Sequence, residues 1–230
     1  FCGAAAVFFA LAERPVPAVL ADANPDLIET FIVLRDEPDA LIDRLTGKAE
    51  QQLHHPEAKE IVLTHDAPWE GSGSGYHSVF RDAGLYRMYY KAWQLTVTPG
   101  KVNTGEHPLF CCYAESDDGI HWRKPELGLH EFKGSKANNI VIPSGKMGPV
   151  DPDGGHPAVF KDENPAAPPE ARYKAVVRSN SPKGLLALKS PDGLHWSPMA
   201  DAPVITDGAF DSQNLAFWDG EHSMYRAYWR

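Results

Sequence analysis

The chain repeats one seven-residue phrase, and this repeat constrains the fold more than any other feature of the sequence. The phrase, Ser-x-Asp-Gly-x-His-Trp, stands at residues 116–122 and again at residues 190–196, so that Asp118 and Asp192 are 74 positions apart. Asp-Gly supplies the backbone dihedral angles of a tight turn, and a Trp after the turn can cover the edge of its sheet. A repeat of this kind and period indicates stacked β-units.

A second phrase, out of phase with the first, occurs three times. Each copy has an apolar strand, a polar turn and a second strand that begins with Tyr and a basic residue. The copies run from Val79 to Tyr90, from Val159 to Val176 and from Phe217 to Tyr228. The segments that precede the two Trp phrases, 109–115 and 184–189, are rich in apolar and β-forming residues. Two hairpins in each period give four strands, the content of one β-propeller blade.

The sequence therefore predicts an all-β chain built as a β-propeller. Three inner hairpins and two outer hairpins are present, roughly two and a half blades, whereas closed propellers carry about four to eight. A β-sandwich is the alternative, but it would not be expected to repeat both phrases in the same order. Because the chain starts at Phe1 rather than Met and its third inner hairpin ends at Arg230, we expect it to be a fragment of a longer propeller.

Three segments are expected along the chain. Residues 1–12, FCGAAAVFFALA, resemble the end of a secretory signal peptide, with a short buried helix as the alternative. Residues 13–68 are expected to be a lead-in, and residues 69–230 the partial propeller. The elements expected in the lead-in are strands at 30–34 and 60–64 and a helix around 40–52. The signal-like start predicts a secreted or periplasmic protein, and it is too short for a membrane span of about 20 residues.

The net charge and the cysteine spacing argue against several kinds of partner and bound group. The formal net charge of −9 argues against a nucleic-acid partner, because phosphate binding needs clustered Lys and Arg. Cys111 and Cys112 are adjacent on a predicted strand, so they should point to opposite faces and not pair. The sequence has no Cys-x-x-Cys and no His-Glu-x-x-His spacing, which argues against a zinc site. Neither a metal nor a cofactor is predicted, and Ca²⁺ at Asp151 and Asp153 stays open. The oligomeric state stays open.

The innermost strands of a propeller line its axis, so chemistry is expected where each inner hairpin begins. All three places carry carboxylates, and the predicted catalytic residues are Asp211, Glu70 and Asp153. Glycoside hydrolysis needs such a set, because one carboxyl group protonates the leaving oxygen while another attacks the sugar or activates water. The alternative is that these acids cap turns, as Asp beside Gly commonly does. For Asp153 the turn is slightly favoured, and for Asp211 the catalytic role.

Aromatic and polar side chains at the same places are expected to bind the sugar, with rings against sugar faces and amide or imidazole groups on hydroxyls. The predicted substrate-binding residues are Trp69, Tyr76, His77, His156, Gln213 and Asn214. The predicted partner is therefore a carbohydrate.

The runs 113–122, 132–141 and 210–214 together resemble secreted bacterial proteins described as glycosyl hydrolase family 32-like. The resemblance extends over roughly residues 69–230. It implies the fold of the wider family 32/43 clan, the five-bladed propeller enzymes similar to invertases, levansucrases and arabinanases. The chain departs from the invertase pattern, since it lacks the Asp-Pro nucleophile motif and has Phe210 and Ser212 beside Asp211 where the family has Arg-Asp-Pro.

The leading hypothesis is a secreted glycoside hydrolase that acts on a furanoside or similar glycan through paired carboxylates. The alternative is a sugar-binding or interaction propeller without catalysis, because a fold does not fix a function and the family's nucleophile motif is absent. A sialidase-like enzyme is disfavoured, since it would need clustered Arg side chains for the substrate carboxylate.

Overall fold

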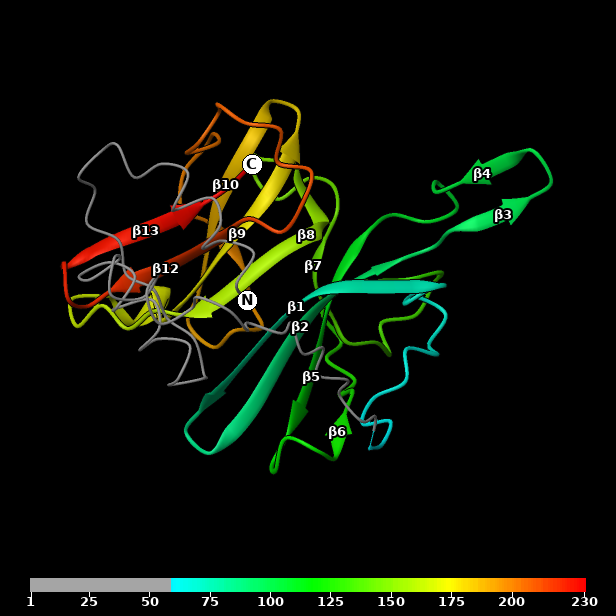
Figure 1. Ribbon diagram of the computed structural model, residues 1–230, viewed down its shortest axis with the longest axis horizontal. Coiled ribbons are helices and arrows are strands. Elements are labelled where there is room, and N and C mark those ends of the chain that lie inside the picture. The colour runs from blue at the N-terminus through cyan, green and yellow to red at the C-terminus, as the bar shows by residue number, and fades with distance from the viewer. Residues whose placement is uncertain (1–58) are drawn as a thin grey trace, which may run out of the picture. The chain divides into compact units, whose positions relative to one another are not determined.

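A computed structural model describes residues 59–230, and their regular structure consists of antiparallel β-strands and one 3-10 turn, η1 (Pro169–Ala171) (Figure 1). The all-β prediction is confirmed for this part of the chain. The signal-like segment 1–12, the strand at 30–34 and the helix around 40–52 lie outside the described residues. Within residues 59–230, no helix is long and apolar enough to span a bilayer.

Two sheets have the strand order of propeller blades. The first contains β1 (Gly73–Asp82), β2 (Leu85–Trp93), β5 (Phe110–Ser116) and β6 (Trp122–Arg123), and β7 (Ile140–Pro143) pairs with the other half of β5. The second contains β8 (Pro152–Lys161), β9 (Tyr173–Asn180), β10 (Lys183–Ser190) and β11 (Ser197–Pro198). In each sheet the four strands follow one another in chain order, so the predicted pairing of an inner with an outer hairpin is confirmed.

The third inner hairpin is also present. It consists of β12 (Leu215–Asp219) and β13 (Met224–Tyr228), which form a two-stranded antiparallel sheet. The two large sheets and this hairpin are the three repeat units of the chain. Strand β8 contacts both β1 and β12, so the first strands of the three units are neighbours. This is the arrangement that brings the starts of the inner hairpins together.

The repeated phrase closes both outer hairpins in the same way. Asp118 Oδ1 accepts 2.8 Å hydrogen bonds from the main-chain N–H groups of Ile120 and His121. Asp192 Oδ1 accepts the equivalent 2.8 Å hydrogen bonds from the N–H groups of Leu194 and His195. Gly119 and Gly193 both have a φ of 82°. The predicted turns are confirmed, but the glycine alone takes the left-handed conformation, while the aspartate acts as a side-chain acceptor that satisfies the turn.

The hydrophobic core lies on both faces of the first sheet. Cys111 belongs to a cluster that joins the two large sheets and includes Tyr89 and Leu186. Cys112 belongs to a second cluster on the opposite face, with Tyr90. Both thiols are buried and free, so the prediction that the adjacent cysteines point apart and do not pair is confirmed.

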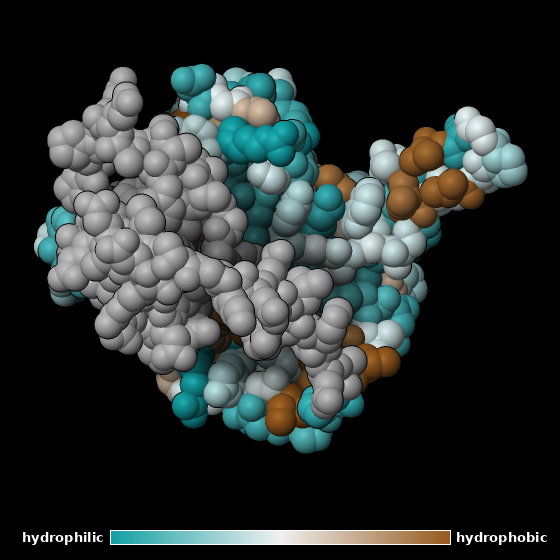
Figure 2. Space-filling model, viewed as in Figure 1, coloured by the Kyte–Doolittle hydropathy of each residue, from teal (hydrophilic) through white to brown (hydrophobic). Residues whose placement is uncertain are grey.

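Two local features differ from the sequence prediction. The strand predicted at 60–64 is wrong, because these residues pair with no other strand in the described part and Ile61 is 86% exposed. A hairpin that was not predicted, β3 (Thr96–Thr98) and β4 (Lys101–Asn103), projects away from the sheets (Figure 1). Its facing Val97 and Val102 are exposed, and the hairpin forms a brown patch in Figure 2.

Candidate functional site

Strands β1 and β8 both interrupt their ladders near their beginnings. In β1 the register with β2 shifts between Gly75 and Ser78, and in β8 the register with β9 shifts between Asp153 and Ala158. Tyr76, inside the first interruption, has a φ of 54°. Bulges of this kind turn side chains away from the regular alternation and are frequent beside functional sites. The two interruptions hold several of the predicted site residues.

Four predicted residues meet at these interruptions. Asp153 Oδ2 lies 3.0 Å from His156 Nδ1, and the His156 ring lies 5.5 Å from the Tyr76 ring. Gln213, just before β12, donates a 3.1 Å hydrogen bond to the Tyr76 carbonyl. Residues from all three units thus converge. Together with two basic side chains and Trp93, described next, these four residues form what we call the axial cluster: Tyr76, Lys91, Trp93, Asp153, His156, Arg178 and Gln213.

Two basic side chains of the axial cluster were not predicted. Lys91 Nζ, on β2, lies 5.3 Å from the Tyr76 ring centroid and 4.6 Å from that of Trp93. Arg178 Nε, on β9, lies 3.3 Å from Asp153 Oδ2. Burial lowers the pKa of Lys91, and the nearby Asp153 carboxylate partly offsets this effect. The available signal was the second basic residue of each strand, since β2 carries Arg87 and Lys91, and β9 carries Lys174 and Arg178.

Asp153 provides the carboxylate of the axial cluster and is buried, with 4% of its surface exposed. Burial raises its pKa, but His156, the Gly155 N–H group and Arg178 together outweigh that effect and hold the pKa below the ordinary value. Asp153 is therefore ionised at neutral pH. Such a carboxylate can attack, act as a base or accept a hydrogen bond from a hydroxyl group, but it does not supply the proton of a general acid.

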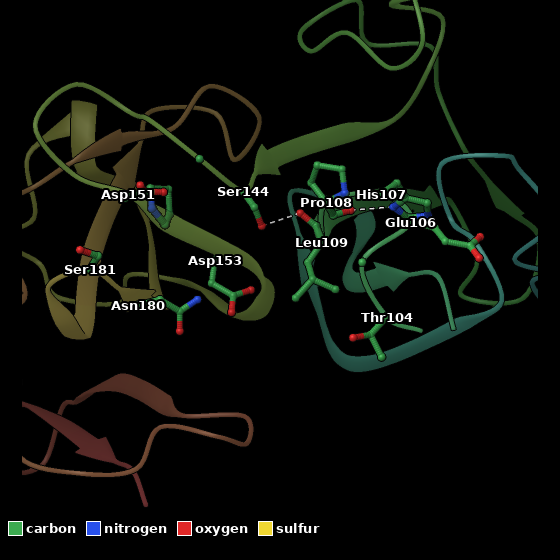
Figure 3. A pocket seen from close by; sticks show the side chains of 13 residues that line it. Thr104, Glu106, His107, Pro108, Leu109, Ser144, Asp151, Asp153, Asn180 and Ser181 are labelled. Carbon is green, nitrogen blue, oxygen red and sulfur yellow. Dashed lines mark hydrogen bonds between the residues drawn. The ribbon is translucent and has the colours of Figure 1, made fainter. Parts of the chain in front are cut away.

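Asp153 also lines an open groove of about 510 Å³ (Figure 3). One side carries Asp151, Asp153, Asn180 and Ser181, and the other is formed by the segment from Thr104 to Leu109. The volume lies in the range of roughly 300–1,000 Å³ that is usual for small-molecule sites. The groove therefore borders the backbone and side chain of Asp153, while the other members of the axial cluster lie outside its lining.

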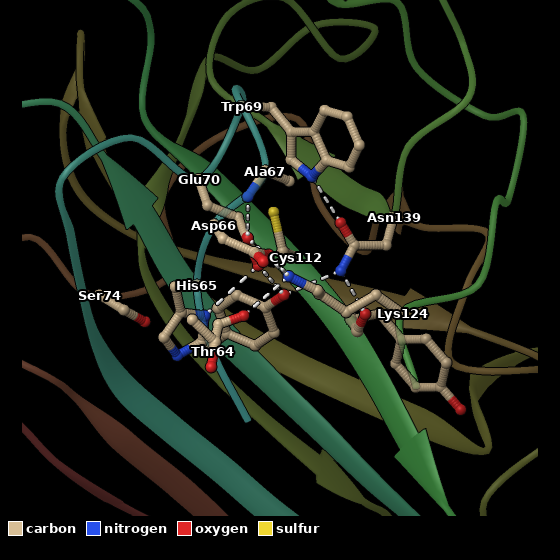
Figure 4. Close-up of polar contacts among 12 residues, drawn as sticks. Thr64, His65, Asp66, Ala67, Trp69, Glu70, Ser74, Cys112, Lys124 and Asn139 are labelled. Atoms are coloured by element: carbon tan, nitrogen blue, oxygen red, sulfur yellow. Dashed lines mark hydrogen bonds and ion pairs between the residues drawn. The ribbon is translucent and has the colours of Figure 1, made fainter. Parts of the chain in front are cut away.

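Glu70 and Trp69 lie in a different place, a buried polar network (Figure 4). The Glu70 carboxylate accepts hydrogen bonds from the Ala67 N–H group at 2.8 Å, the Tyr90 hydroxyl at 2.6 Å and Lys124 Nζ at 2.9 Å. Trp69 Nε1 donates a 2.6 Å hydrogen bond to the Asn139 side chain, which in turn bonds to Tyr90.

The surroundings of Glu70 decide its protonation. Burial raises the pKa of the carboxyl group, but hydrogen bonds from His65, Tyr90 and Lys124 outweigh burial and lower the pKa to about 2. Glu70 is therefore a permanent anion at neutral pH. Neither Glu70 nor Trp69 lines the groove of Asp153, and Glu70 cannot serve as the proton donor in glycoside hydrolysis.

The remaining predicted residues lie beside these two places. Asp211 is exposed, 3.6 Å from Arg230 Nε, and Asn214 is buried and donates a 2.9 Å hydrogen bond to the Ser212 carbonyl. His77, next to Tyr76, points its Nε2 atom toward His65 rather than His156. Within residues 59–230 there is no group of three or more His, Cys, Asp or Glu side chains placed to hold a metal ion.

Comparison with known proteins gives matches of two kinds. The family model for D12 class N6 adenine-specific DNA methyltransferases matches residues 1–61, a stretch that includes the signal-like segment. No curated protein matches the chain.

Three solved structures are similar to 64% of the chain. They are a BT0996 RGII complex (15% identity, TM-score 0.40), a structure described as a glycoside hydrolase (13% identity, TM-score 0.38) and a glycosyl hydrolase from Bacteroides ovatus (17% identity, TM-score 0.34). The similar region spans 44%, 44% and 39% of those proteins, respectively.

Proposed function

We propose that this chain is part of a carbohydrate-active β-propeller that hydrolyses glycosidic bonds in a furanoside or similar glycan. The observation that carries the proposal is the axial cluster, in which three successive units place a buried, ionised Asp153 beside aromatic rings and hydrogen-bond donors. Asp153 is also the member of the axial cluster that lines the groove of about 510 Å³, a volume in the range of small-molecule sites. The signal-like residues 1–12 support action outside the cytoplasm.

In this proposal each part of the axial cluster has a role in binding or attack. Asp153 is the nucleophile or base, and His156 and Arg178 hold its carboxylate in one orientation. The Tyr76 and Trp93 rings offer flat apolar faces for a sugar ring. Lys91 brings N–H donors that can bind sugar hydroxyls, and Gln213, whose amide NH₂ group donates to the Tyr76 and Pro157 carbonyls, offers its side-chain oxygen.

A glycosidase of this type also needs a carboxyl group that carries a proton. Glu70 does not fit, because its pKa is about 2 and its oxygens are committed to the buried network. Asp211 is the proposed second carboxylate beside Asp153, since it stands two residues from Gln213, which bonds to Tyr76; its exposed position 3.6 Å from Arg230 Nε suits an anion, so the protonated acid is expected to be another group. A separation of about 5 Å between the two carboxyl groups would give retention of configuration, and one of roughly 6.5–9.5 Å would give inversion.

One observation favours the alternative of a sugar-binding propeller without catalysis. Asp153 already contacts the Gly155 N–H group, His156 and Arg178, so both of its oxygens have protein partners. A carboxylate held in this way can position neighbouring donors around a sugar without reacting.

The two functions are separated by testing the 230-residue chain on one panel of arabinofuranosides, fructofuranosides and their polymers. Turnover is measured by chromatography of the released sugar, and binding by isothermal titration calorimetry. Released sugar supports hydrolysis, and NMR of the first anomer formed then reports retention or inversion. Binding without release supports the non-catalytic alternative, and the absence of both overturns the carbohydrate assignment.

A further inference from the structure

Two imidazole rings meet nitrogen to nitrogen beside the buried network of Glu70. His65 Nε2 and His77 Nε2 are 3.4 Å apart, with the ring centroids 5.5 Å apart and the planes tilted by 47°. The His65 side chain is 24% exposed, and His77 lies on the surface of β1. The pair is therefore accessible from solvent, and it stands outside the axial cluster and the proposed hydrolytic function.

Glu70 fixes the tautomer of His65. Its carboxylate accepts hydrogen bonds from the Ala67 N–H group, the Tyr90 hydroxyl and Lys124, and it lies 3.3 Å from His65 Nδ1. The proton of a neutral His65 ring therefore sits on Nδ1, and the lone pair of Nε2 faces His77. A carboxylate behind the Nδ1 atom of a histidine whose Nε2 is free is the usual outer shell of a metal-ligating imidazole.

The distance between the two nitrogens fits a bridging ion, and as a direct hydrogen bond it would be long, like the 3.3 Å contact between His65 Nδ1 and Glu70. An N–H···N contact is expected at about the 2.7–3.2 Å of other protein hydrogen bonds. Two nitrogens bound to a tetrahedral Zn²⁺ at about 2.0–2.1 Å lie roughly 3.3–3.4 Å apart, which matches the observed 3.4 Å. We propose that His65 and His77 form a two-histidine site for a divalent transition metal ion, and the N–N spacing fits tetrahedral Zn²⁺.

The electrostatic setting suits a cation. Lys124, the nearest cation of the network, is neutralised by Glu70 at 2.9 Å and by Asp66 at 2.8 Å. The contacts of His77 Nε2 are His65 Nε2 and Ser74 Oγ, both at 3.4 Å, and neither is a carboxylate. Neutral imidazole is the form that binds metal ions.

The protein supplies two nitrogen ligands, and water completes the coordination. Ser74 Oγ lies 3.4 Å from His77 Nε2, close enough to hydrogen-bond a metal-bound water. Since no third His, Cys, Asp or Glu joins the pair in the described part of the chain, the site should bind Zn²⁺ reversibly rather than permanently. Imidazole ligands also favour Cu²⁺ and Zn²⁺ over Mg²⁺ and Ca²⁺.

The test is calorimetric titration of the 230-residue chain with ZnCl₂. His77→Ala removes one ligand from an exposed strand position, and His195→Ala is the matched control, since His195 is also exposed and contacts an Asp rather than a second imidazole. We expect a Zn²⁺ site that the wild type and His195→Ala share and His77→Ala lacks. Identical titrations of His77→Ala and the wild type would overturn the proposal.

Two further measurements keep the result decisive if a variant misfolds. Glu70→Gln should weaken Zn²⁺ binding by roughly 10–100-fold, the usual cost of losing an outer-shell carboxylate, while circular dichroism reports whether the sheets remain. In a crystal of the wild type soaked in ZnCl₂, an anomalous peak is expected between the two Nε2 atoms. Anomalous peaks only at other sites, or unchanged affinity in a folded Glu70→Gln, would count against the site.

Discussion

The Arg87 side chain of β2 donates a 2.8 Å hydrogen bond to the main-chain carbonyl of Asp192, in the outer loop of the neighbouring sheet. This contact fixes the loop of the second sheet against the first. The next residue, Gly193, faces the buried Tyr89, and a Cβ atom there would overlap the Tyr89 hydroxyl and lie 3.1 Å from Arg87 Nη1. The two sheets therefore meet at a glycine with no room for a side chain.

The equivalent Gly119 provides a matched comparison. Gly119 and Gly193 share a φ of 82°, but a Cβ at Gly119 would lie 3.6 Å from the Tyr86 ring, an ordinary contact. Gly119→Ala should cost about 1–2 kcal/mol of unfolding free energy for the left-handed backbone alone. Gly193→Ala should cost a further 1–3 kcal/mol or so for overpacking. Urea denaturation of the two variants checks this, and equal losses would show that the sheets are not tightly packed at Gly193.

A second prediction concerns the carboxylate in the groove. If Asp153 attacks the sugar or acts as a base, Asp153→Asn should lower kcat on a glycan substrate by roughly 10²–10⁴-fold. Asp151→Asn is the control, because Asp151 lines the same groove but faces Lys146 at 3.8 Å rather than the axial cluster. Steady-state kinetics of both variants decide the matter, and an unchanged kcat in Asp153→Asn would remove it from the catalytic set.

The buried network of Glu70 predicts a pH dependence of stability. The pKa of Glu70 is about 2 in the folded chain against an ordinary 4.5, so the folded state binds this proton less readily than the unfolded state. Its contribution is complete above about pH 4.5 and is lost as the pH falls toward 2. The shift corresponds to about 3 kcal/mol.

Urea denaturation between about pH 7 and pH 2 measures this effect. Glu70→Gln should flatten the acid limb of the stability profile and lower stability at neutral pH. Asp66→Asn changes the other, exposed partner of Lys124 and should leave most of the acid limb in place. A Glu70→Gln profile parallel to that of the wild type would show that the network does not bias this carboxyl group.

The adjacent cysteines give a chemical test of the first sheet. Burial raises the pKa of both thiols, so neither forms a reactive thiolate near neutral pH. In a Cys2→Ser chain, which leaves Cys111 and Cys112, a thiol reagent at about pH 8 should label no site in the native protein and both sites in urea. Rapid labelling of one site under native conditions would mean that one face of β5 is open.

The hairpins could be predicted because their signals are local. Each is encoded by a turn motif between runs of β-forming residues, and the phrase around Asp118 recurs around Asp192 with the same hydrogen bonds. The β3–β4 hairpin also has a local signal, Pro99-Gly100, with Gly100 at a φ of 74°. It was missed because its strands are only three residues long and mostly polar.

The site was harder to predict because its contacts join distant parts of the chain. Propeller topology was enough to group Tyr76, Asp153 and Gln213 at the starts of the inner strands. It could not show that Lys124, which is 54 residues further along, would bind Glu70 and help to keep it ionised. The pairing of His65 with His77 depends in the same way on how an irregular segment folds back on β1.

The interruptions in β1 and β8 have a consequence for how such a site can diversify. Residues 76–77 and 154–157 stand outside the paired register of their strands, while the flanking residues keep theirs. Mutations at residues 76–77 can therefore alter the local surface without a compensating change in the scaffold, whereas Gly154 leaves no room for a Cβ beside the Ile142 carbonyl. At these two positions, variation in the surface is uncoupled from the hydrogen-bond register that holds the sheet.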